Sequence, residues 1–335
     1  MTPPIVLVSF NRPELTRHTL DRIREMAPSE LFLLVDGPRS MHPEDPARVA
    51  SVIAELELID WPCTVHRRYA ETNLGIAANI ELGLDWVFEH TASAVILEDD
   101  CAPDPTFYRY CSELLERYNN DSRVGYIGGA TTHLAPELFH GHSYAFTAFG
   151  SIWGWATWRR AWHQHRRLFP RDHRGNNAAP IRTAPIDWDS TALVSSMGRR
   201  FFQSPSPVAD RVVSSWAIHW VLSNLSTGSL AITSAVPLVA NLGFGEHGTN
   251  TRTKRVLPTA GAMTFPLIHP AEVALNRDLE LEMERHIRRE LGALARIARR
   301  VVPQGRSRVF ARRLDQGFAA IGSRLRARRA GRSQG

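Results

Sequence analysis

Short apolar runs alternate with amphipathic stretches along the first 130 residues of the chain. The apolar runs predict buried strands, with one more polar member at 63–69; the others lie at 5–10, 31–35, 93–97 and 124–127. Between them, apolar residues recur at helical spacing, which predicts helices at 13–26, 47–58, 76–89 and 105–118. Strands and helices that alternate through short connections predict an α/β fold with a parallel, doubly wound sheet.

Polar residues follow these predicted strands at the point where each one ends. The four groups are Ser9 with Asn11 and Arg12, then Asp36, then Asn73 with Gly75, and finally Glu98 with Asp99 and Asp100. The carboxyl ends of parallel strands meet at one edge of a sheet, so we expect these groups to converge on one ligand. Each group alone is also typical of turn chemistry or of the start of a helix. Four groups in register favour a binding site.

Three consecutive carboxylates, Glu98, Asp99 and Asp100, end the predicted strand at 93–97. The prolines at 103 and 105 follow at once and stop the strand, because proline removes a ladder donor. Side-chain alternation predicts that Glu98 and Asp100 lie on one side of the strand and Asp99 on the other. Such acids repel one another, which costs stability unless a cation or hydrogen-bond donors compensate, and their oxygens suit Mg²⁺ or Mn²⁺ carrying a phosphate. The alternative is an acidic turn or a helix-capping cluster.

The segment 152–162 is rich in tryptophan and contains Trp153, Trp155, Trp158 and Trp162. Aromatic faces beside hydrogen-bond donors suit stacking on sugar rings, so we expect Trp153, Trp155 and Trp158 to bind an acceptor molecule. The alternative interpretation is a buried, tryptophan-rich core segment.

The composition of three later segments is typical of loops and helix ends that lie near a binding site. The segment 169–189 is irregular and rich in Pro, Arg and His, which is typical of a mobile loop that closes over a site. A helix is predicted at 212–225, and Asp210 before it is either a helix cap or a functional carboxylate. The glycine-rich stretch 241–250 is typical of a loop that approaches a ligand closely.

The overall charge of +6 is unevenly distributed along the chain. Residues 285–335 hold 15 arginines and two acids, a net +13, and subtracting this from +6 leaves −7 for the rest. A nucleic-acid-binding core is therefore disfavoured, and we expect no specific nucleic-acid partner. Apolar residues at helical spacing from residue 279 onward predict a basic helical tail that lies on an anionic membrane surface. Non-specific nucleic-acid binding and a solvated tail are the alternatives.

Cysteine usage and the N-terminus bear on the compartment. The cysteines at 63, 101 and 111 are odd in number and lack metal-type spacing, which favours a reduced protein. No charged region precedes the first apolar run, as it would in a signal peptide. We therefore expect a cytoplasmic protein, attached peripherally at the inner face of the cell membrane through its tail.

The order of these motifs resembles that of bacterial nucleotide-sugar glycosyltransferases, and more narrowly that of the hemolytic-protein-like sugar transferases. The motifs are Ser-Phe-Asn-Arg-Pro from Ser9, Val-Asp-Gly-Pro-Arg from Val35, Asn-Leu-Gly from Asn73, Ile-Leu-Glu-Asp-Asp-Cys from Ile96, the tryptophan block from Trp153, and Asn-Leu-Gly-Phe-Gly from Asn241. Eukaryotic N-acetylglucosaminyltransferase I, which also has a Glu-Asp-Asp motif, is more distantly similar. The resemblance runs from about Ile5 to Thr251 and leaves out the tail.

The resemblance implies a GT-A fold, which is a Rossmann-like fold of nucleotide-diphospho-sugar transferases. It implies a nucleoside-diphosphate sugar, usually a UDP-sugar, as the donor. We accordingly expect a donor-binding half at 1–130, an acceptor and catalytic half of the same domain at 131–270, and the basic tail at 271–335.

The resemblance also implies roles for individual residues. Asp100 would ligate Mn²⁺ or Mg²⁺ through the diphosphate, and we expect His247 to complete the metal shell. The expected donor-binding residues are Asn11, Arg12, Asp36, Asn73, Gly75, Glu98 and Asp99.

The chain departs from the family's pattern at two positions. Ala217 stands where the family carries an acid after its tryptophan, and Asn250 stands where the family carries a histidine. An inverting transferase needs one carboxylate to take the acceptor proton. Our candidates for this base, in order, are Asp210, Asp189 and Glu246.

We therefore expect a metal-dependent, inverting hexosyl- or N-acetylhexosaminyltransferase of polysaccharide biosynthesis. Its acceptor would be a glycan, a lipid-linked molecule or a small molecule. One alternative is a non-catalytic nucleotide-sugar or glycan-binding protein, which Ala217 favours. The other is a sugar nucleotidyltransferase, which the lack of a glycine-rich, lysine-bearing phosphate loop near the N-terminus disfavours.

Overall fold

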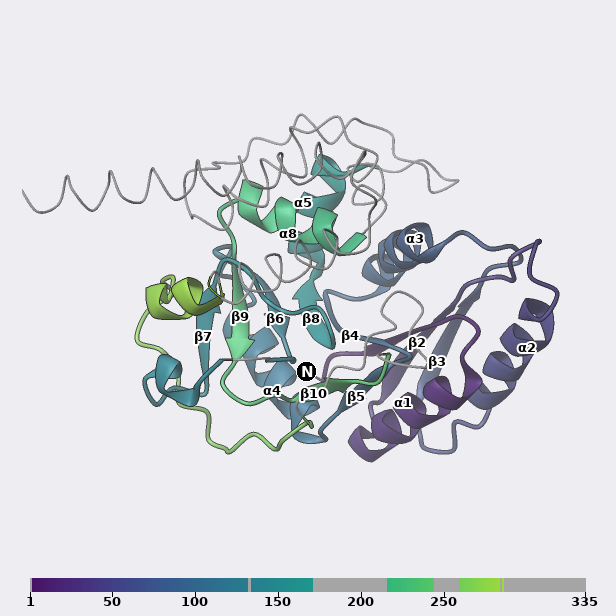
Figure 1. Cartoon of the computed structure of the whole chain (residues 1–335), viewed down its shortest axis with the longest axis horizontal. Coiled ribbons are helices and arrows are strands. Elements are labelled where there is room, and N and C mark those ends of the chain that lie inside the picture. Colours follow the sequence, from purple (N-terminus) through teal and green to yellow (C-terminus); the bar gives the residue numbers. More distant parts are fainter. Residues whose placement is uncertain (1, 132–133, 171–215, 244–258, 284, 286–335) are drawn as a thin grey trace, which may run out of the picture. The chain divides into compact units, whose positions relative to one another are not determined.

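The computed structural model describes residues 2–131, 134–170, 216–243, 259–283 and 285 of the 335-residue chain (Figure 1). The strands are β1 (Ile5–Ser9), β2 (Glu30–Val35), β3 (Thr64–Tyr69), β4 (Ser93–Glu98), β5 (Cys101–Pro103), β6 (Val124–Gly128), β7 (Tyr144–Thr147), β8 (Trp155–Trp158), β9 (Leu230–Ser234) and β10 (Val239–Asn241). The helices are α1 (Pro13–Met26), α2 (Asp45–Leu56), α3 (Ile76–His90), α4 (Thr106–Arg117), α5 (Arg159–Leu168), α8 (Trp216–Ser226) and the short 3₁₀ helix η1 (Pro136–Phe139).

The strands and helices predicted within the first 130 residues are all present, and their ends lie within two residues of the expected positions. The predicted helix at 212–225 is present as α8, although residues 212–215 lie outside the described part of the chain. Residues 171–189 of the predicted loop, most of the glycine-rich loop and the predicted tail, apart from residues 271–283 and 285, also lie outside it.

The main sheet has the strand order β3-β2-β1-β4-β8-β6-β9-β7. The first four of these strands are parallel, with a helical crossover between consecutive ones, as the sequence predicts. The predicted strand β6 runs in the same direction as β4, because β8, from beyond residue 130, is inserted antiparallel between them and makes the sheet mixed. The fold class is nevertheless the predicted one, an α/β fold with a Rossmann-like parallel half.

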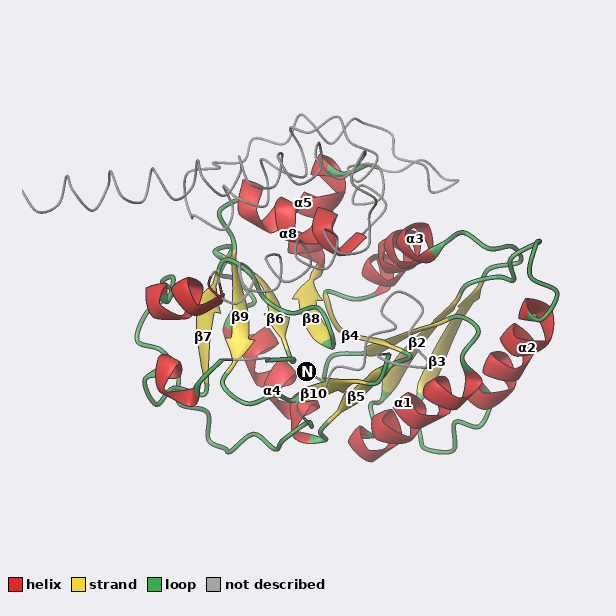
Figure 2. Ribbon diagram, in the orientation of Figure 1, coloured by secondary structure: helices red, strands yellow, loops and turns green. Residues whose placement is uncertain are grey.

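Helices cover both faces of the main sheet (Figure 2). Alternate residues of β1 point to opposite faces: Ile5 and Leu7 join one buried cluster, and Val6 and Val8 join the other. The first cluster includes apolar residues of α1, α2 and α4, and the second includes those of α3, α5 and α8. The near-continuous apolar runs of the parallel strands are thus explained by burial on both faces.

The proline-rich segment after the acids behaves differently from the prediction. The main-sheet strand does end at Glu98, but Cys101–Pro103 forms a new strand, β5, which pairs antiparallel with β10 in a small second sheet. Proline is tolerated there because β5 is an edge strand of this two-stranded sheet.

The residues from 2 to 280 that the structure describes belong to one compact unit, which contains both sheets. The described residues 281–283 and 285 belong to a second unit. Among the described residues, no helix is both long enough and apolar enough to cross a membrane.

Candidate functional site

The polar groups that follow β1, β2, β3 and β4 lie at one edge of the main sheet. The residues just after β2 and β4 remain tied to β1, because the backbone N–H of Asp36 donates to Ser9 O (3.1 Å) and that of Asp99 donates to Val8 O (2.9 Å). The strand register therefore fixes where these polar residues lie relative to one another. An edge of this kind, outside the carboxyl ends of parallel strands, is where ligands bind in open α/β sheets.

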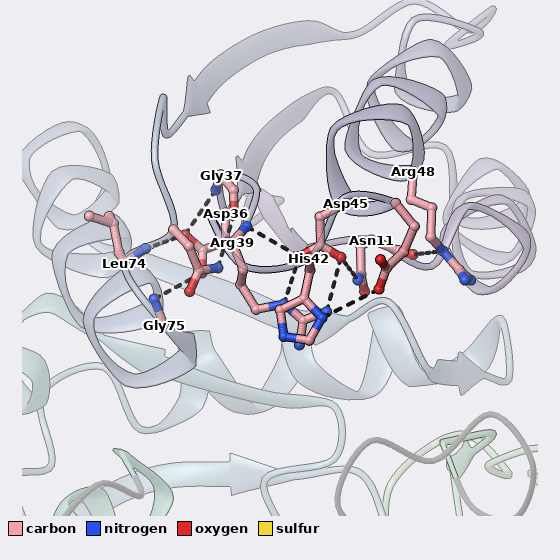
Figure 3. Close-up of polar contacts among 11 residues, drawn as sticks. Asn11, Asp36, Gly37, Arg39, His42, Asp45, Arg48, Leu74 and Gly75 are labelled. Atoms are coloured by element: carbon pink, nitrogen blue, oxygen red, sulfur yellow. Dashed lines mark hydrogen bonds and ion pairs between the residues drawn. The ribbon is translucent and has the colours of Figure 1, made fainter.

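Asp36 organises the loop that leads into α3 (Figure 3). Its Oδ1 accepts hydrogen bonds from the backbone N–H groups of Gly37 (2.9 Å) and Leu74 (2.8 Å). Its Oδ2 accepts from Asn73 Nδ2 (2.9 Å) and from the backbone N–H of Gly75 (3.0 Å). Burial raises the pKa of Asp36, while the three backbone N–H groups act against this shift. Both oxygens are thus engaged by the chain itself, so Asp36 shapes the loop that was expected to hold the base and ribose.

The conformation of this loop requires a glycine. Gly75 immediately precedes α3 and has a φ of 79°, in the region that residues with a side chain rarely adopt. Its N–H is one of those held by Asp36. Gly75 and Asp36 therefore act together to set the start of α3.

Asn11, at the end of β1, is held from the neighbouring α2. Its Nδ2 donates to Asp45 Oδ1 (2.7 Å), and its carbonyl accepts from Arg48 Nε (2.9 Å). Asp45 is fully buried and also binds Arg39, whose guanidinium hydrogen-bonds hold the pKa of Asp45 well below its usual range. These contacts, drawn in Figure 3, keep the segment before Arg12 in place.

Arg12 lies between two of the three acids. Its Nε and Nη2 both donate to the carboxylate of Asp99, with Nε 3.3 Å from Oδ2, and its Nη1 donates to Asp100 Oδ2 (3.1 Å). The Asp99 side chain is 2% exposed, that of Asp100 is 15% exposed and that of Arg12 is 20% exposed. Both oxygens of the buried Asp99 carboxylate therefore bind Arg12, whereas the Asp100 carboxylate retains access to solvent.

The predicted alternation of the three acids is wrong for Asp99 and Asp100. The strand ends at Glu98, and the next two residues form a turn, so both aspartates reach the same guanidinium. The turn is fixed by Thr19 on α1, whose hydroxyl lies 2.8 Å from Asp99 O and 2.9 Å from Cys101 O.

The charges of the three acids affect one another. Burial raises the pKa of Glu98 to about 8, and repulsion from Asp100 and Asp99 adds to that effect. Burial also raises the pKa of Asp99 to about 6, although Arg12 opposes this shift. For Arg12 itself, burial lowers the pKa, but the two aspartates raise it by more, so the net shift is upward. The cluster thus holds one resident cation and still disfavours full ionisation.

The two-stranded sheet of β5 and β10 places the start of the glycine-rich stretch next to Asp100. The N–H of Leu242, directly after β10, donates to Asp100 O (2.8 Å). A Cβ atom built on Gly243 would overlap Oδ2 of Asp100, so only glycine allows this approach. The sequence indicated a close-approach loop here, but not that it meets Asp100.

Sequence reasoning missed Thr19 and the specific place of Gly243. Thr19 is fully buried on the face of α1 that also buries Thr16, Leu20 and Ile23, and a polar residue at a core position of α1 was the available signal. Gly243 belongs to an Asn-Leu-Gly repeat of the Asn73 motif, and only the β5–β10 pairing shows what it approaches.

Two of the three tryptophans expected to bind an acceptor lie in the core. Trp155 and Trp158 are each 1% exposed in β8; Trp155 stacks on Trp216 of α8, and Trp158 Nε1 donates to Leu115 O (3.0 Å). Such side chains present no face to a ligand, so the acceptor-binding prediction is wrong for both. Trp153 lies just before β8 and is half-buried, packed on the edge of the core.

The candidates for the catalytic base and for the second metal ligand lie outside the described residues: Asp189, Asp210, Glu246 and His247. Ala217, which replaces the acid expected from the family pattern, is partly buried in the first turn of α8.

The described side chains at the end of β4 provide part of what a divalent cation needs for its coordination. Within the described part of the chain, no three or more His, Cys, Asp and Glu side chains are arranged to hold a metal ion. Magnesium at phosphate sites usually takes only one or two carboxylates and completes its shell with phosphate oxygens and water. Asp100 is such a carboxylate: it is partly accessible, and it already binds a cation, the guanidinium of Arg12.

The chain has distant structural likenesses among solved proteins. No protein-family model matches the chain, and no curated protein matches it. The chain is similar to a UDP-glucose pyrophosphorylase complexed with UDP-glucose, at 9% identity over 51% of this chain and 81% of that one, with a TM-score of 0.32. It is similar at 12% identity to a putative glucose-1-phosphate thymidylyltransferase from Bacillus anthracis in complex with a sucrose, over 52% of this chain and 77% of that one, again with a TM-score of 0.32. At this level of similarity, the neighbours do not bear on the chain's activity.

Proposed function

We propose that the chain is a metal-dependent glycosyltransferase that moves a sugar, with inversion, from a nucleoside-diphosphate sugar to a glycan, lipid-linked or small-molecule acceptor. A UDP-sugar is the proposed donor. The observation that carries the proposal is the end of β4, where three acids and Arg12 meet at the edge at which α/β sheets bind ligands. A site with both a phosphate-binding arginine and an accessible carboxylate suits a diphosphate bound with a divalent cation.

In this proposal, different residues at the sheet edge bind different parts of the donor. We assign the nucleoside to Asn11 and to the loop at 73–75, which Asp36 shapes, and we assign the diphosphate to Arg12 and Asp100, which contact each other. Glu98 and Asp99 are the expected partners of ribose or sugar hydroxyls. Since Asp99 binds Arg12 with both oxygens, its contribution would be made through the position of that arginine.

The proposed reaction is a single displacement at the sugar's anomeric carbon. The acceptor oxygen forms a bond to that carbon, the bond to the diphosphate oxygen breaks, and the diphosphate leaves with the electron pair. A bound divalent cation, held by Asp100 with His247 as a proposed partner, would stabilise this leaving group. The acceptor's proton passes to a carboxylate, for which Asp210, Asp189 and Glu246 remain the proposed candidates. Trp153 is the proposed acceptor contact.

Product analysis tests this proposal. The full-length chain is incubated with Mn²⁺ and UDP-, GDP- or TDP-sugars, with and without a panel of glycan and lipid-linked acceptors. Acceptor-dependent release of one nucleoside diphosphate is expected. Release of pyrophosphate from a nucleoside triphosphate and a sugar 1-phosphate would instead identify a nucleotidyltransferase, and donor binding without turnover would identify a binding protein.

A further inference from the structure

We infer that Arg12 competes with the divalent cation for the aspartates at the end of β4. When the donor binds, its diphosphate accepts a hydrogen bond from the Arg12 guanidinium in place of Asp100, and the competition ends. The inference rests on the proposed function, because it concerns how that site loads its donor. It assigns Arg12 a regulatory role: the cation binds weakly alone and tightly together with a diphosphate.

The competition follows from the contacts of the guanidinium. Each of its three nitrogens donates to a carboxylate: Nε and Nη2 to Asp99, and Nη1 to Asp100 Oδ2. The two aspartates carry two negative charges at most, and one positive charge already lies within hydrogen-bond distance of both. A divalent ion bound at Asp100 would have to replace the Nη1 contact and would then lie close to a like charge.

The two ion pairs differ in burial, which predicts which of them yields. The pair with Asp99 is bidentate and its carboxylate is 2% exposed, whereas Asp100 contributes a single contact and is 15% exposed. A cation arriving from solvent therefore meets the outer pair first. Displacement of Nη1 from Asp100 leaves the ion pair with Asp99 intact. The guanidinium therefore stays at the site, and its Nη1 group is available to donate to another acceptor.

A free Nη1 beside a bound cation is a site for an anion with several oxygens. A diphosphate can accept a hydrogen bond from Arg12 and also ligate the cation at Asp100, which replaces the repulsion between the two positive charges by two attractions. Cation and diphosphate should then strengthen each other's binding, and this coupling must be equal in both directions.

Cation binding in the absence of nucleotide isolates the role of Arg12. Mn²⁺ alone is titrated into the full-length chain and followed by electron paramagnetic resonance of the free ion, for the wild type, Arg12→Gln and Arg12→Lys. Arg17→Gln is the matched control, because Arg17 lies one turn further along α1 and pairs with Glu55 on the exposed side. Far-ultraviolet circular dichroism checks that each variant is folded.

We expect Arg12→Gln to bind Mn²⁺ alone about tenfold more tightly than the wild type, or more, because one positive charge is removed beside the ligand. Arg17→Gln should match the wild type. Arg12→Lys keeps the charge, but a single ammonium cannot bridge two carboxylates as a guanidinium does, so its Mn²⁺ affinity should lie between the two. Adding UDP should tighten Mn²⁺ binding strongly in the wild type and much less in Arg12→Gln.

Unchanged or weaker Mn²⁺ binding in folded Arg12→Gln overturns the inference, and if that variant does not fold, wild-type affinity in Arg12→Lys overturns it equally. Either result leaves the proposed function standing if UDP still binds the wild type with Mn²⁺. Failure of the wild type to bind any nucleoside diphosphate defeats the proposed function and the diphosphate half of the inference. The titrations with Mn²⁺ alone still decide whether Arg12 competes.

Discussion

At the scale of single residues, two aspartates at the same edge of the sheet differ in how many of their hydrogen-bond positions the chain itself occupies. Asp36 is surrounded by donors from its own chain, which occupy both of its oxygens. Asp100 has one contact to Arg12 and remains accessible to solvent. Residue type and spacing place both acids at strand ends, but they do not reveal which is occupied, because three of the four donors to Asp36 come from a loop 37 to 39 residues away.

Asp36→Ala should therefore act on stability. The substitution leaves the backbone N–H groups of Gly37, Leu74 and Gly75 without this acceptor, and we expect it to lower the free energy of unfolding by about 2–4 kcal/mol. Asp60→Ala removes an exposed ion pair and should cost less than about 1 kcal/mol. Urea denaturation of both variants measures the difference, and equal costs would show that Asp36 does not hold the loop.

At the scale of elements, β8 is one of the strands that the sequence did not reveal, together with β5, β7, β9 and β10. Local pattern is sufficient for β1, β2 and β3, because each of these strands is followed directly by a helix. Strand β8 pairs with β4, which lies about 60 residues earlier, and its tryptophans fit a ligand surface as well as a core. Only the pairing with β4 and β6 separates these interpretations, and the same is true of the small β5–β10 sheet.

The core position of β8 predicts how its tryptophans respond to truncation. Trp158→Leu removes a fully buried ring and its hydrogen bond to Leu115 O, and we expect a loss of about 3 kcal/mol in the free energy of unfolding. Trp153→Leu should cost clearly less, because Trp153 is half-buried. If the two substitutions destabilise the protein equally in thermal or urea unfolding, the assignment of β8 to the core is wrong.

The segment 259–276 is attached to α4 and β7 through His269. Its Nδ1 lies 2.9 Å from the Tyr144 hydroxyl, and its Nε2 lies 3.5 Å from Glu113 Oε1. Burial, together with the charge of Arg117, lowers the pKa of His269 below its ordinary value of 6.5. The folded state therefore binds this proton less readily than the unfolded state, and stability from this group is lost as the pH falls below about 6.5.

His269→Gln removes this titration and keeps a polar group near Tyr144. We expect the stability of the wild type relative to the variant to fall between pH 7.5 and pH 5, as measured by urea unfolding at both values. Comparison with the variant cancels the other groups, including Glu98 and Asp99, whose raised pKa values act in the opposite direction. A relative stability that is constant, or that rises on acidification, would contradict the lowered pKa of His269.

At the scale of the whole molecule, the sheet and the charge belong to different parts of the chain. Both sheets lie between residues 5 and 241, in one compact unit, whereas residues 285–335 carry the net charge of +13. The sequence predicts this division because a run of arginines with few acids cannot contribute to a buried sheet. The catalytic base is a different case, since its candidates at 189, 210 and 246 lie outside the described residues.

The basic tail leads to a prediction about membranes. We propose that the full chain attaches peripherally to anionic membrane surfaces through this tail, and we expect it to co-sediment with phosphatidylserine vesicles at low salt. Phosphatidylcholine vesicles should not retain it, and salt of about 0.5 M should release it, because screening shortens the reach of surface charges. Deletion of residues 285–335 should abolish vesicle binding without changing nucleotide binding, and a truncated chain that still co-sediments would refute the role of the tail.

Donor binding by calorimetry tests the central claim most directly. UDP, GDP and TDP are titrated with and without Mn²⁺ into the wild type, Asp100→Asn and the control Asp60→Asn, whose aspartate is half exposed and distant in sequence from the acids. The account predicts that one nucleoside diphosphate binds the wild type and the control only when Mn²⁺ is present, and that Asp100→Asn loses this binding. Binding that needs no metal, or that survives in Asp100→Asn, would contradict a metal-dependent donor site at the end of β4.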